Sequence, residues 1–410
     1  MVVGFGDNAE SPRALSFAIM RLQSTIDTLR TLVAFDTTSI HSNLQLIEWV
    51  ANRLDRPGIT VQVQHGEEAG KANLFATIGP TDVPGLMLSG HSDVVPVAGQ
   101  VWQTDPFALT ERDGILHARG SADMKGFIAC MVEQAPEWLA ARLRRPIHIA
   151  LSYDEETSMR GMRQLAQQLA IAPVKPIGCV IGEPTSMRMV VANKGAAGFR
   201  VKVRGHSVHS SLRDSGVSAV ETAAEIVVYC RNLQDRLRDR ARHDGFEFPH
   251  TSIHVGRIQG GTAHNITARD CEFLLEIRAL PGVTAADLLA DIRNWCEREL
   301  LPAMKAVSTD CGIEFEEIFD TPALDERGNT YLAEALRPFC AHASVGRVSF
   351  GTEAGILQGI GIPTVVCGPG RIAVAHQPDE GLEIEQLDQC LAFLETIKAS
   401  LVNNDLKLAA

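Results

Sequence analysis

The sequence contains no CxxC pair, no long run of lysine and arginine, and no uninterrupted apolar stretch of the roughly 18 residues that a membrane span needs. Without a basic run, and with a net charge of −12, a nucleic-acid-binding surface is not expected. The first residues, MVVGFGDNAESPR, lack the basic segment and the long apolar segment of a secretory signal. These absences argue against a nucleic-acid partner, a membrane protein and a secreted protein.

The nine cysteines are scattered between Cys130 and Cys390 without a repeated spacing. Zinc–thiolate sites and disulfide frameworks show regular spacings, so neither is expected. An odd number of cysteines without a framework is typical of reduced thiols in a cytoplasmic protein, where most are buried as small apolar side chains. The rest of the composition, 45% hydrophobic and 21% charged, is that of an ordinary soluble globular protein.

A chain of 410 residues is too long for one hydrophobic core and predicts two domains. In its first part, apolar runs that predict strands alternate with helical apolar patterns. The predicted strands cover 61–63, 73–78, 85–89, 147–153 and 178–181, and the predicted helices cover 15–35, 44–54, 127–143 and 160–169. This alternation is typical of an α/β fold with a mainly parallel sheet, in which ligands bind beyond the carboxyl ends of the strands.

The pattern changes near Lys194. The residues that follow predict a strand at 198–203, a helix at 217–237, strands at 252–260 and 271–280, a helix at 285–304 and a strand at 313–318. This β-α-β-β-α-β order is that of a ferredoxin-like α+β domain. After Pro322 the first pattern resumes, with a helix at 330–340 and a strand at 363–367. We therefore expect a first domain in two parts, 1–193 and 321–410, with a second domain, 194–320, inserted between them.

Five short patches carry acidic or histidine side chains, and most lie where a predicted strand ends. They are His91-Ser92-Asp93, Asp123, Asp154-Glu155-Glu156, Glu183 and His376. Imidazole and carboxylate groups are ligands for divalent metal ions such as zinc. Because several patches fall at the ends of strands in one sheet, the set predicts a two-metal hydrolase site. Asp93, two residues after His91, is placed to accept the second N–H of a metal-bound imidazole.

Each patch also has an ordinary structural explanation. His91 and Asp93 are compatible with a polar turn, and Asp123 is compatible with an N-cap for the helix that begins near Lys125. The three adjacent carboxylates at 154–156 repel one another unless cations or solvent screen them, which fits either a metal site or a solvated turn. His376 is compatible with a buried core histidine. The set as a whole is what favours catalysis.

The patches belong to longer segments that resemble the M20 metallopeptidase family over nearly the whole chain. In the family's order, the matching segments are SGHSDVVPV, ARGSADMKGF, YDEE, GEPT, RGHSVHSS, GGTAHNITARDCEFLLEIRALPG, FGTEAG and AHQPDEG. The chain is most similar to the acetylornithine deacetylase branch, which includes relatives that act on succinyl-diaminopimelate. The resemblance implies a zinc-exopeptidase-like catalytic domain, an amidohydrolase with two zinc ions or with zinc and cobalt, and an inserted lid or dimerisation domain.

The resemblance also implies a set of metal ligands drawn from all five patches. One ion would be held by His91, Asp123 and Glu183, and the other by Asp123, Glu156 and His376. Asp123 would bridge the two ions and would precede a cis peptide bond. Glu155 would be the general base that takes a proton from the attacking water, and Asp93 would orient His91.

On the substrate side, the resemblance implies contacts to the substrate carboxylate and backbone. The residues concerned are Asn265, Arg278, Gly351 and Thr352. A bidentate arginine suits a carboxylate, although Arg278 is also compatible with a surface ion pair. Glu353 and Glu380 are candidate partners for a basic amine of the substrate. His209 would stabilise the oxyanion from another subunit, and His206 is the alternative because the family usually has a single histidine here.

We therefore expect a cytoplasmic, homodimeric enzyme that removes the acetyl group from N-acetylornithine in arginine biosynthesis. Its partners would be a small N-acyl amino acid and a second copy bound through the inserted domain. The alternatives are another acyl-amino-acid hydrolase, such as a succinyl-diaminopimelate desuccinylase or an aminoacylase, and a glutamate-type carboxypeptidase. An inactive binding homologue would be expected to lack Glu155 or a metal ligand, and this chain lacks neither.

Overall fold

The computed structural model describes residues 12–240, 242–340 and 342–404. The chain forms two compact units. The first, called the large unit, comprises Met1–Met189, Tyr331–Val345 and Val365–Ala410, and the second, called the small unit, comprises Val190–Thr330 and Gly346–Thr364. All nine cysteines are free thiols and eight of them are buried, as expected from their scattered spacing. Among the described residues, no helix combines the length and the apolar character that crossing a membrane requires.

An eight-stranded mixed sheet has the strand order β1-β2-β6-β3-β7-β14-β8-β13. Its strands are β1 (Ile59–His65), β2 (Ala72–Ile78), β3 (Leu86–His91), β6 (Ile147–Ser152), β7 (Gly178–Pro184), β8 (Val190–Asn193), β13 (Gly346–Val348) and β14 (Thr364–Gly368). Strand β3 pairs in parallel with β6 and β7, whereas β2 runs antiparallel to both β1 and β6. The expected α/β class, with a largely parallel centre, is therefore confirmed.

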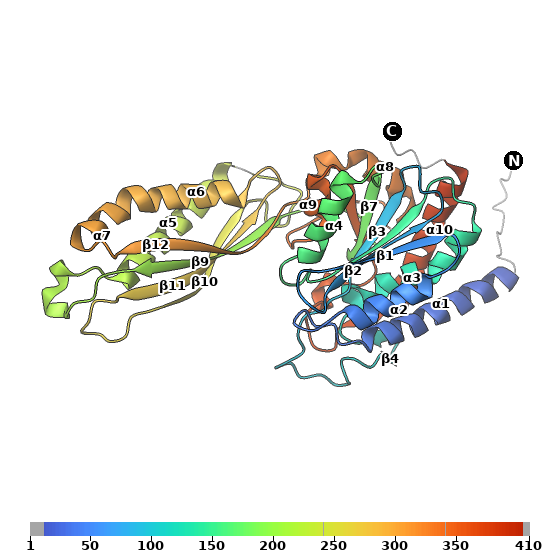
Figure 1. The fold of residues 1–410 in the computed structure, drawn as a ribbon, viewed down its shortest axis with the longest axis horizontal. Coiled ribbons are helices and arrows are strands. Elements are labelled where there is room, and N and C mark those ends of the chain that lie inside the picture. The colour runs from blue at the N-terminus through green and yellow to red at the C-terminus, as the bar shows by residue number, and fades with distance from the viewer. Residues whose placement is uncertain (1–11, 241, 341, 405–410) are drawn as a thin grey trace, which may run out of the picture. The chain divides into compact units, whose positions relative to one another are not determined.

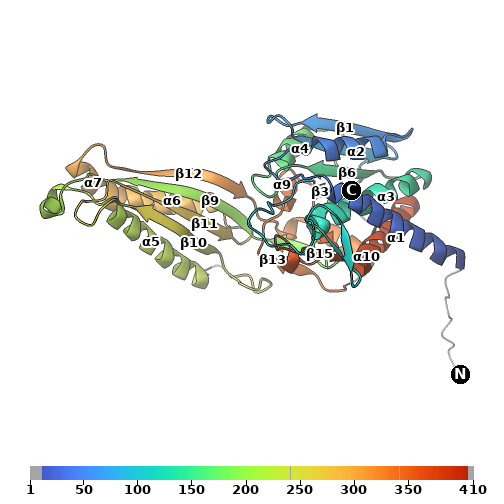
Figure 2. The same cartoon turned by 90° about the horizontal axis from the view of Figure 1, so that it is seen from below.

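The central strands β3, β6 and β7 are buried along their whole length, which is why their sequences are nearly continuous apolar runs. Helix α3 (Gly126–Ala140) connects β3 to β6, and α4 (Arg160–Ile171) connects β6 to β7. The two connections cross the sheet in opposite directions, so right-handed crossovers place α3 and α4 on opposite faces (Figure 1). Helices α1 (Pro12–Val33) and α10 (Ile384–Asn403) pack against α3 (Figure 2), and α2 (Leu44–Leu54) packs against β1 and β2.

A small three-stranded sheet, which the sequence patterns did not predict, lies next to the candidate site. It consists of β4 (Thr110–Arg112), β5 (Ile115–His117) and β15 (Gly381–Glu383), in the order β15-β5-β4. Strands of three residues are too short to show a hydrophobic period. The pairing of Gly381 with His117 joins the segment that follows His376 to the segment that precedes Asp123. The two segments come from separate stretches of the large unit's sequence, Met1–Met189 and Val365–Ala410.

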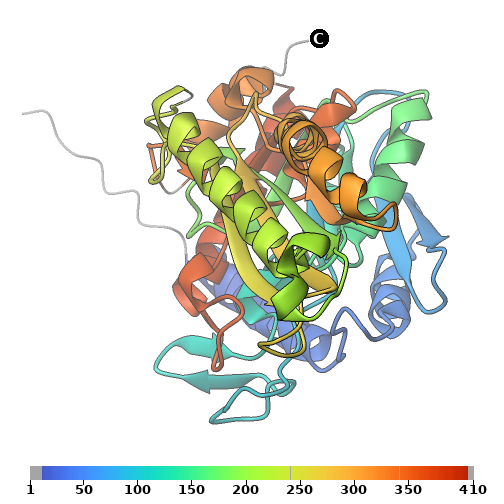
Figure 3. The same ribbon diagram turned by 90° about the vertical axis from the view of Figure 1, so that its left-hand side faces the viewer.

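The small unit contains a four-stranded antiparallel sheet in the order β10-β11-β9-β12. Its elements are β9 (Gly195–Arg204), α5 (Ala219–Arg240), β10 (Ser252–Gly260), β11 (Asp270–Ala279), α6 (Ala285–Trp295), α7 (Leu301–Val307) and β12 (Gly312–Thr321). Helices α5 and α6 lie side by side on one face of the sheet (Figures 1 and 3). Alternate strand residues such as Val201 and Phe273 are buried beneath them, whereas Lys202 is on the opposite face. The β-α-β-β-α-β order and the strand order are those of the expected ferredoxin-like arrangement.

The helix expected over 285–304 is interrupted. Helix α6 ends at Trp295, a wider π-helical turn covers Cys296–Leu300, and α7 follows. Pro302 explains the break, because proline has no N–H to donate and its ring collides with the carbonyl one turn earlier. The prediction of one continuous helix was therefore wrong at this proline.

Candidate metal centre

The candidate site lies beyond the carboxyl ends of β3, β6 and β7 in the large unit, where the sequence placed it. His91 is the last residue of β3, and Glu183 lies in β7 next to its end. The His91 side chain is buried, with 1% of its surface exposed. Its Nε2 atom lies 3.1 Å from Asp123 Oδ1 and 3.7 Å from Glu183 Oε1. Carboxylates from two other patches thus converge on the His91 imidazole.

The Asp123 carboxylate lies between two imidazoles. Its Oδ1 atom faces His91 Nε2 at 3.1 Å, and its Oδ2 atom faces His376 Nε2 at 3.3 Å. His376 Nε2 is also 3.0 Å from Glu156 Oε2. The peptide bond between Asp123 and Met124 is cis, as the family resemblance implies. The two oxygens of one carboxylate therefore point to two different groups of ligand atoms.

The donor chemistry fits divalent cations. Among the described residues, two groups of three side chains bring their ligand atoms within 4.8 Å of one another: His91 with Asp123 and Glu156, and His91 with Glu155 and Glu183. Carboxylates crowded in a buried site disfavour each other's charge unless a cation or a proton balances it. Accordingly, burial and the charge of Asp123 raise the pKa of Glu156 to about 7. Imidazole nitrogens and carboxylate oxygens are the donors that zinc and cobalt accept.

The Asp93 carboxylate contacts a different neighbour from the one expected. His91 Nδ1 lies 2.9 Å from the backbone carbonyl of Asp93 and 3.7 Å from the Oδ1 atom of its carboxylate. The carboxylate accepts the backbone N–H groups of Glu155, at 3.1 Å, and of Glu156, at 3.3 Å. It also accepts the Ser39 hydroxyl at 2.7 Å. Asp93 thus holds the imidazole through its backbone and the Glu155–Glu156 turn through its side chain.

Asp154, the first of the three adjacent acids, faces away from this cluster. Its backbone adopts a positive φ of 57°, and its carboxylate pairs with the buried Lys71 ammonium at 2.6 Å. Lys71 also donates to the Ser39 carbonyl. Burial raises the pKa of Asp154, although the Lys71 ion pair opposes that shift. One of the three acids is therefore structural, and Lys71 is a partner that the sequence patterns did not identify.

Glu380 holds the loop that carries Asp123, and it is not a partner for a substrate amine. Its carboxylate is fully buried and accepts the backbone N–H groups of Gly120, Ala122 and Asp123 at 2.9–3.0 Å. It also accepts a hydrogen bond from Arg119 at 2.7 Å. The expectation of a basic substrate group at Glu380 was therefore wrong, because these donors occupy both oxygens. No signal in the sequence indicated this role, because the burial of Arg119, which requires an acidic partner, is visible only in the structure.

The remaining predicted residues belong to the small unit. His209 is exposed, and its Nδ1 accepts the Ser211 backbone N–H at 3.2 Å. His206 pairs through its backbone with Val217. Arg278 makes an ion pair with Glu276 at 2.7 Å, which is the surface pair considered as the alternative. The other predicted residues are Asn265, which is exposed, Gly351, which is half-buried, and Thr352 and Glu353, which are buried.

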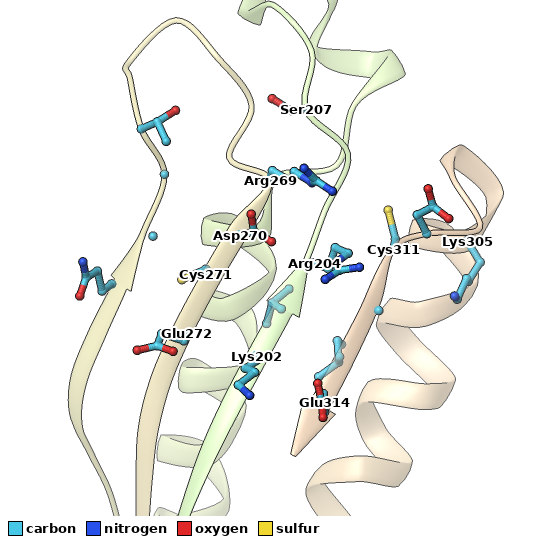
Figure 4. A pocket seen from close by; sticks show the side chains of 18 residues that line it. Lys202, Arg204, Ser207, Arg269, Asp270, Cys271, Glu272, Lys305, Cys311 and Glu314 are labelled. Carbon is cyan, nitrogen blue, oxygen red and sulfur yellow. The ribbon is translucent and has the colours of Figure 1, made fainter. Parts of the chain in front are cut away.

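A large cavity of about 780 Å³ lies on the sheet of the small unit, and none of the predicted site residues lines it. Figure 4 shows Lys202, Arg204, Asp270, Glu272 and Glu314 around it. Four basic and four acidic side chains line it, so the lining has no net charge that would favour an anion or a cation. Its size does not outweigh the chemistry of the metal centre, and we place the candidate site at the cluster around Asp123.

Comparisons with known proteins identify the family of the chain. The model of the family described as peptidase family M20/M25/M40 matches residues 87–399 of the chain. The chain is 35% identical over 383 residues to an acetylornithine deacetylase of Proteus mirabilis, covering 92% of this chain and 94% of the relative. It is 34% identical over 382 residues to an acetylornithine deacetylase of Pasteurella multocida, covering 93% of this chain and 97% of that relative.

The fold is similar to that of solved structures. A dinuclear metal-binding peptidase of the M20 family from Bacillus subtilis superimposes with a TM-score of 0.64, at 14% sequence identity. The match covers 94% of this chain and 99% of that one. At this identity the likeness concerns the fold, which includes both the mixed sheet and the smaller antiparallel sheet.

Proposed function

The chain belongs to peptidase family M20/M25/M40 and is a hydrolase of that metal-dependent family, and on this premise we propose that it removes the acetyl group from N2-acetyl-L-ornithine. The products would be L-ornithine and acetate, a step of arginine biosynthesis. The observation that carries the proposal is the Asp123 carboxylate, whose two oxygens face the imidazoles of His91 and His376 at 3.1 and 3.3 Å. One carboxylate shared by two sets of donors is the arrangement that a two-metal amidohydrolase needs.

Two divalent ions would be held by the residues of this cluster. The proposed ligands are His91, Asp123 and Glu183 for one ion, and Asp123, Glu156 and His376 for the other. Zinc suits this mixture of imidazole and carboxylate donors, and cobalt is the alternative. When bound, the pair of ions would lower the pKa of a water molecule and polarise the amide carbonyl. The protein's own part is to place these donors and to move protons.

Glu155 is the proposed general base. Glu155 lies in the turn that follows β6, next to Asp154. Its backbone N–H donates a hydrogen bond to the Asp93 carboxylate, which holds the turn in place. Glu155 would take a proton from the attacking water as the new C–O bond forms at the acetyl carbon. It would then deliver that proton to the amide nitrogen as the C–N bond breaks, so that ornithine leaves as an amine and acetate remains.

His209 is the proposed donor to the oxyanion. Its Nδ1 accepts the Ser211 backbone N–H at 3.2 Å, so in the neutral imidazole the proton is on Nε2, which can then donate. A donor placed where negative charge develops contributes roughly 3–4 kcal/mol to the stability of a transition state. His206 is the alternative donor. In the structure it pairs with Val217 through its backbone.

Asn265, Gly351 and Thr352 are the proposed contacts to the substrate's amino-acid part. Arg278 stays in this set as the proposed partner of the substrate carboxylate, but Glu276 competes with that carboxylate for the guanidinium. We also propose that two copies associate through the small unit. Strand β10 is an edge strand that exposes most of its residues, including Ile258, and Val228 on the neighbouring α5 is also exposed. An unpaired edge beside apolar side chains is suited to pairing with a second chain.

The test is a comparison of substrates on the zinc-loaded protein. N-acetylornithine should be hydrolysed with a higher kcat/KM than succinyl-diaminopimelate and than simple N-acetyl amino acids. Faster hydrolysis of one of the other substrates would assign the chain to another acyl-amino-acid hydrolase of the family. A protein loaded with two metal ions but inert to all of them would refute the proposal.

A further inference from the structure

We propose that Arg119 and Glu380 are positioning residues that hold Asp123 and His376 in the relative places the second metal ion requires. This inference rests on the proposed function, because it concerns the same two-metal site. Neither residue is a proposed metal ligand, because the Arg119 guanidinium is a cation that offers only donors and both Glu380 oxygens already accept hydrogen bonds. They would act through the backbone that they hold.

Glu380 fixes the loop before Asp123. Its Oε2 atom accepts the backbone N–H of Gly120 at 3.0 Å, and its Oε1 atom accepts those of Ala122 at 2.9 Å and Asp123 at 3.0 Å. These N–H groups precede α3, so no earlier helical turn supplies acceptors for them. The carboxylate takes the place of that missing turn and fixes the direction in which the Asp123 side chain leaves the loop.

Arg119 connects the same loop to His376. Its Nη1 atom donates to Glu380 at 2.7 Å, and its Nη2 atom donates to Gln100 Oε1 at 2.6 Å. Gln100 in turn donates from Nε2 to the His376 backbone carbonyl at 2.8 Å. The guanidinium also lies over the Trp102 ring at 5.0 Å. A continuous chain of hydrogen bonds therefore runs from the backbone of Asp123 to the backbone of His376.

A buried ion pair is a costly way to stabilise a fold, because apolar side chains of similar size often do as well. Apolar side chains could not accept three backbone N–H groups or connect two loops. The cost is understandable if the pair sets the distance between the imidazole of His376 and the carboxylate of Asp123, which is 3.3 Å. His91 and Glu183, by contrast, lie in β3 and β7 and are placed by the sheet itself.

This contrast predicts a selective defect. Without the Arg119–Glu380 pair, the ion held by His91, Asp123 and Glu183 would keep two ligands that the sheet places, and should still bind well. The ion held by Asp123, Glu156 and His376 would have two of its three ligands displaced, and should bind weakly. Loss of the partner of a ligand typically lowers metal affinity 10- to 100-fold. A residue with a merely structural role would weaken both sites alike or lower the folding stability alone.

The experiment measures two zinc dissociation constants for the full chain by competition with a chelator of known affinity. The variants are Glu380→Gln and Arg119→Lys, with Gln100→Ala as a third that removes only the half-exposed connection to His376. Glu221→Gln is the matched control, because Glu221 forms a comparable ion pair with Arg213 but on the exposed surface. In Glu380→Gln and Arg119→Lys, we expect the dissociation constant of the ion held by His91 and Glu183 to stay within about threefold of the wild-type value. The dissociation constant of the ion held by His376 should rise at least tenfold in these two variants, and by a smaller factor in Gln100→Ala.

The inference is overturned if these variants bind both ions as tightly as wild type, or if they weaken both constants equally. If Glu380→Gln or Arg119→Lys fails to fold, the Gln100→Ala result decides. A wild-type protein that binds no zinc would refute the proposed function instead, so the two failures are distinguishable.

Discussion

The Asp93 carboxylate accepts the backbone N–H of Glu155 at 3.1 Å, and this bond fixes the start of the turn that presents the proposed base. The Glu155 side chain has ligand atoms of His91 and Glu183 within 4.8 Å. The geometry is therefore compatible with two roles for Glu155, a general base beside the metal ions or a ligand of one of them.

Replacing Glu155 by alanine separates these roles. A general base contributes roughly 100- to 10,000-fold to a rate, so kcat should fall by that factor while two zinc ions stay bound. Turnover of N-acetylornithine and the zinc content after dialysis measure the two effects. Glu156→Ala is the matched control and should lose zinc, because Glu156 Oε2 lies 3.0 Å from His376. Loss of one zinc ion from Glu155→Ala would make Glu155 a ligand instead.

Removal of the Lys71 charge should destabilise the protein. Its ammonium is 2.6 Å from the Asp154 carboxylate, and both side chains are more than 90% buried. Lys71→Met leaves a buried carboxylate without its partner, at a cost of about 3–5 kcal/mol in the free energy of unfolding. Urea titration of metal-free protein measures the change, and adding Asp154→Asn should recover most of it. Lys202→Met, at an exposed ion pair with Glu316, should behave as wild type. Equal stability of the two lysine variants would contradict the prediction.

Gly368→Ala should disrupt the sheet beside the metal centre. A Cβ atom at Gly368 would lie 2.0 Å from the carbonyl oxygen of Gly182, a contact that two neighbouring backbones cannot relieve. We expect a loss of at least about 2 kcal/mol in unfolding free energy, with weaker zinc binding because Gly182 precedes Glu183. At Gly312 a Cβ atom would meet nothing within 4 Å, so Gly312→Ala should leave stability and zinc binding unchanged. If both alanine variants are equally stable, the close contact at Gly368 does not exist in solution.

His148 should make stability depend on pH. Burial lowers the pKa of this histidine from 6.5 to about 4, so the folded protein holds a neutral imidazole while the unfolded chain takes up a proton below pH 6.5. The associated stability is present above pH 6.5 and is lost as the pH falls toward 4. Between pH 7 and pH 5 the loss is about 2 kcal/mol.

The measurement compares unfolding free energies at pH 7 and pH 5 for metal-free wild type and His148→Gln. The variant should lose about 2 kcal/mol less than wild type over this interval. His254→Gln, at an exposed histidine, serves as the control and should lose as much as wild type. An identical pH dependence of wild type and His148→Gln would rule out this contribution.

Much of the fold was readable because burial leaves a period in the sequence. The apolar runs at β3, β6 and β7 are buried on both sides, and the alternation along β9 and β11 follows from one buried face. The carboxyl ends of parallel strands explain why His91 and Glu183 were expected to meet. Spacing could not place His376, because it follows the small unit in the chain, and only the family resemblance assigned its role.

The positioning groups were missed for a physical reason. Glu380 acts by accepting backbone N–H groups, and the backbone of a loop leaves no pattern in side-chain chemistry. The strands β5 and β15 that bring Glu380 beside Asp123 have three residues each, too few for a period. Helix α10, by contrast, carries a readable apolar pattern over 20 residues and was simply not predicted.

The place of β14 in the sheet has a consequence for the newborn chain. In the sheet, β14 lies between β7 and β8. In the sequence, however, residues 185–363 separate the end of β7 from the start of β14, so the ribosome must translate them before β14 can pair with β7. At typical translation rates that interval lasts on the order of 10–40 s. During it the edge of β7 has no partner and can pair with other nascent chains. Slow elongation after β7 should therefore favour aggregation, and holding chaperones should matter most before β14 has left the ribosome.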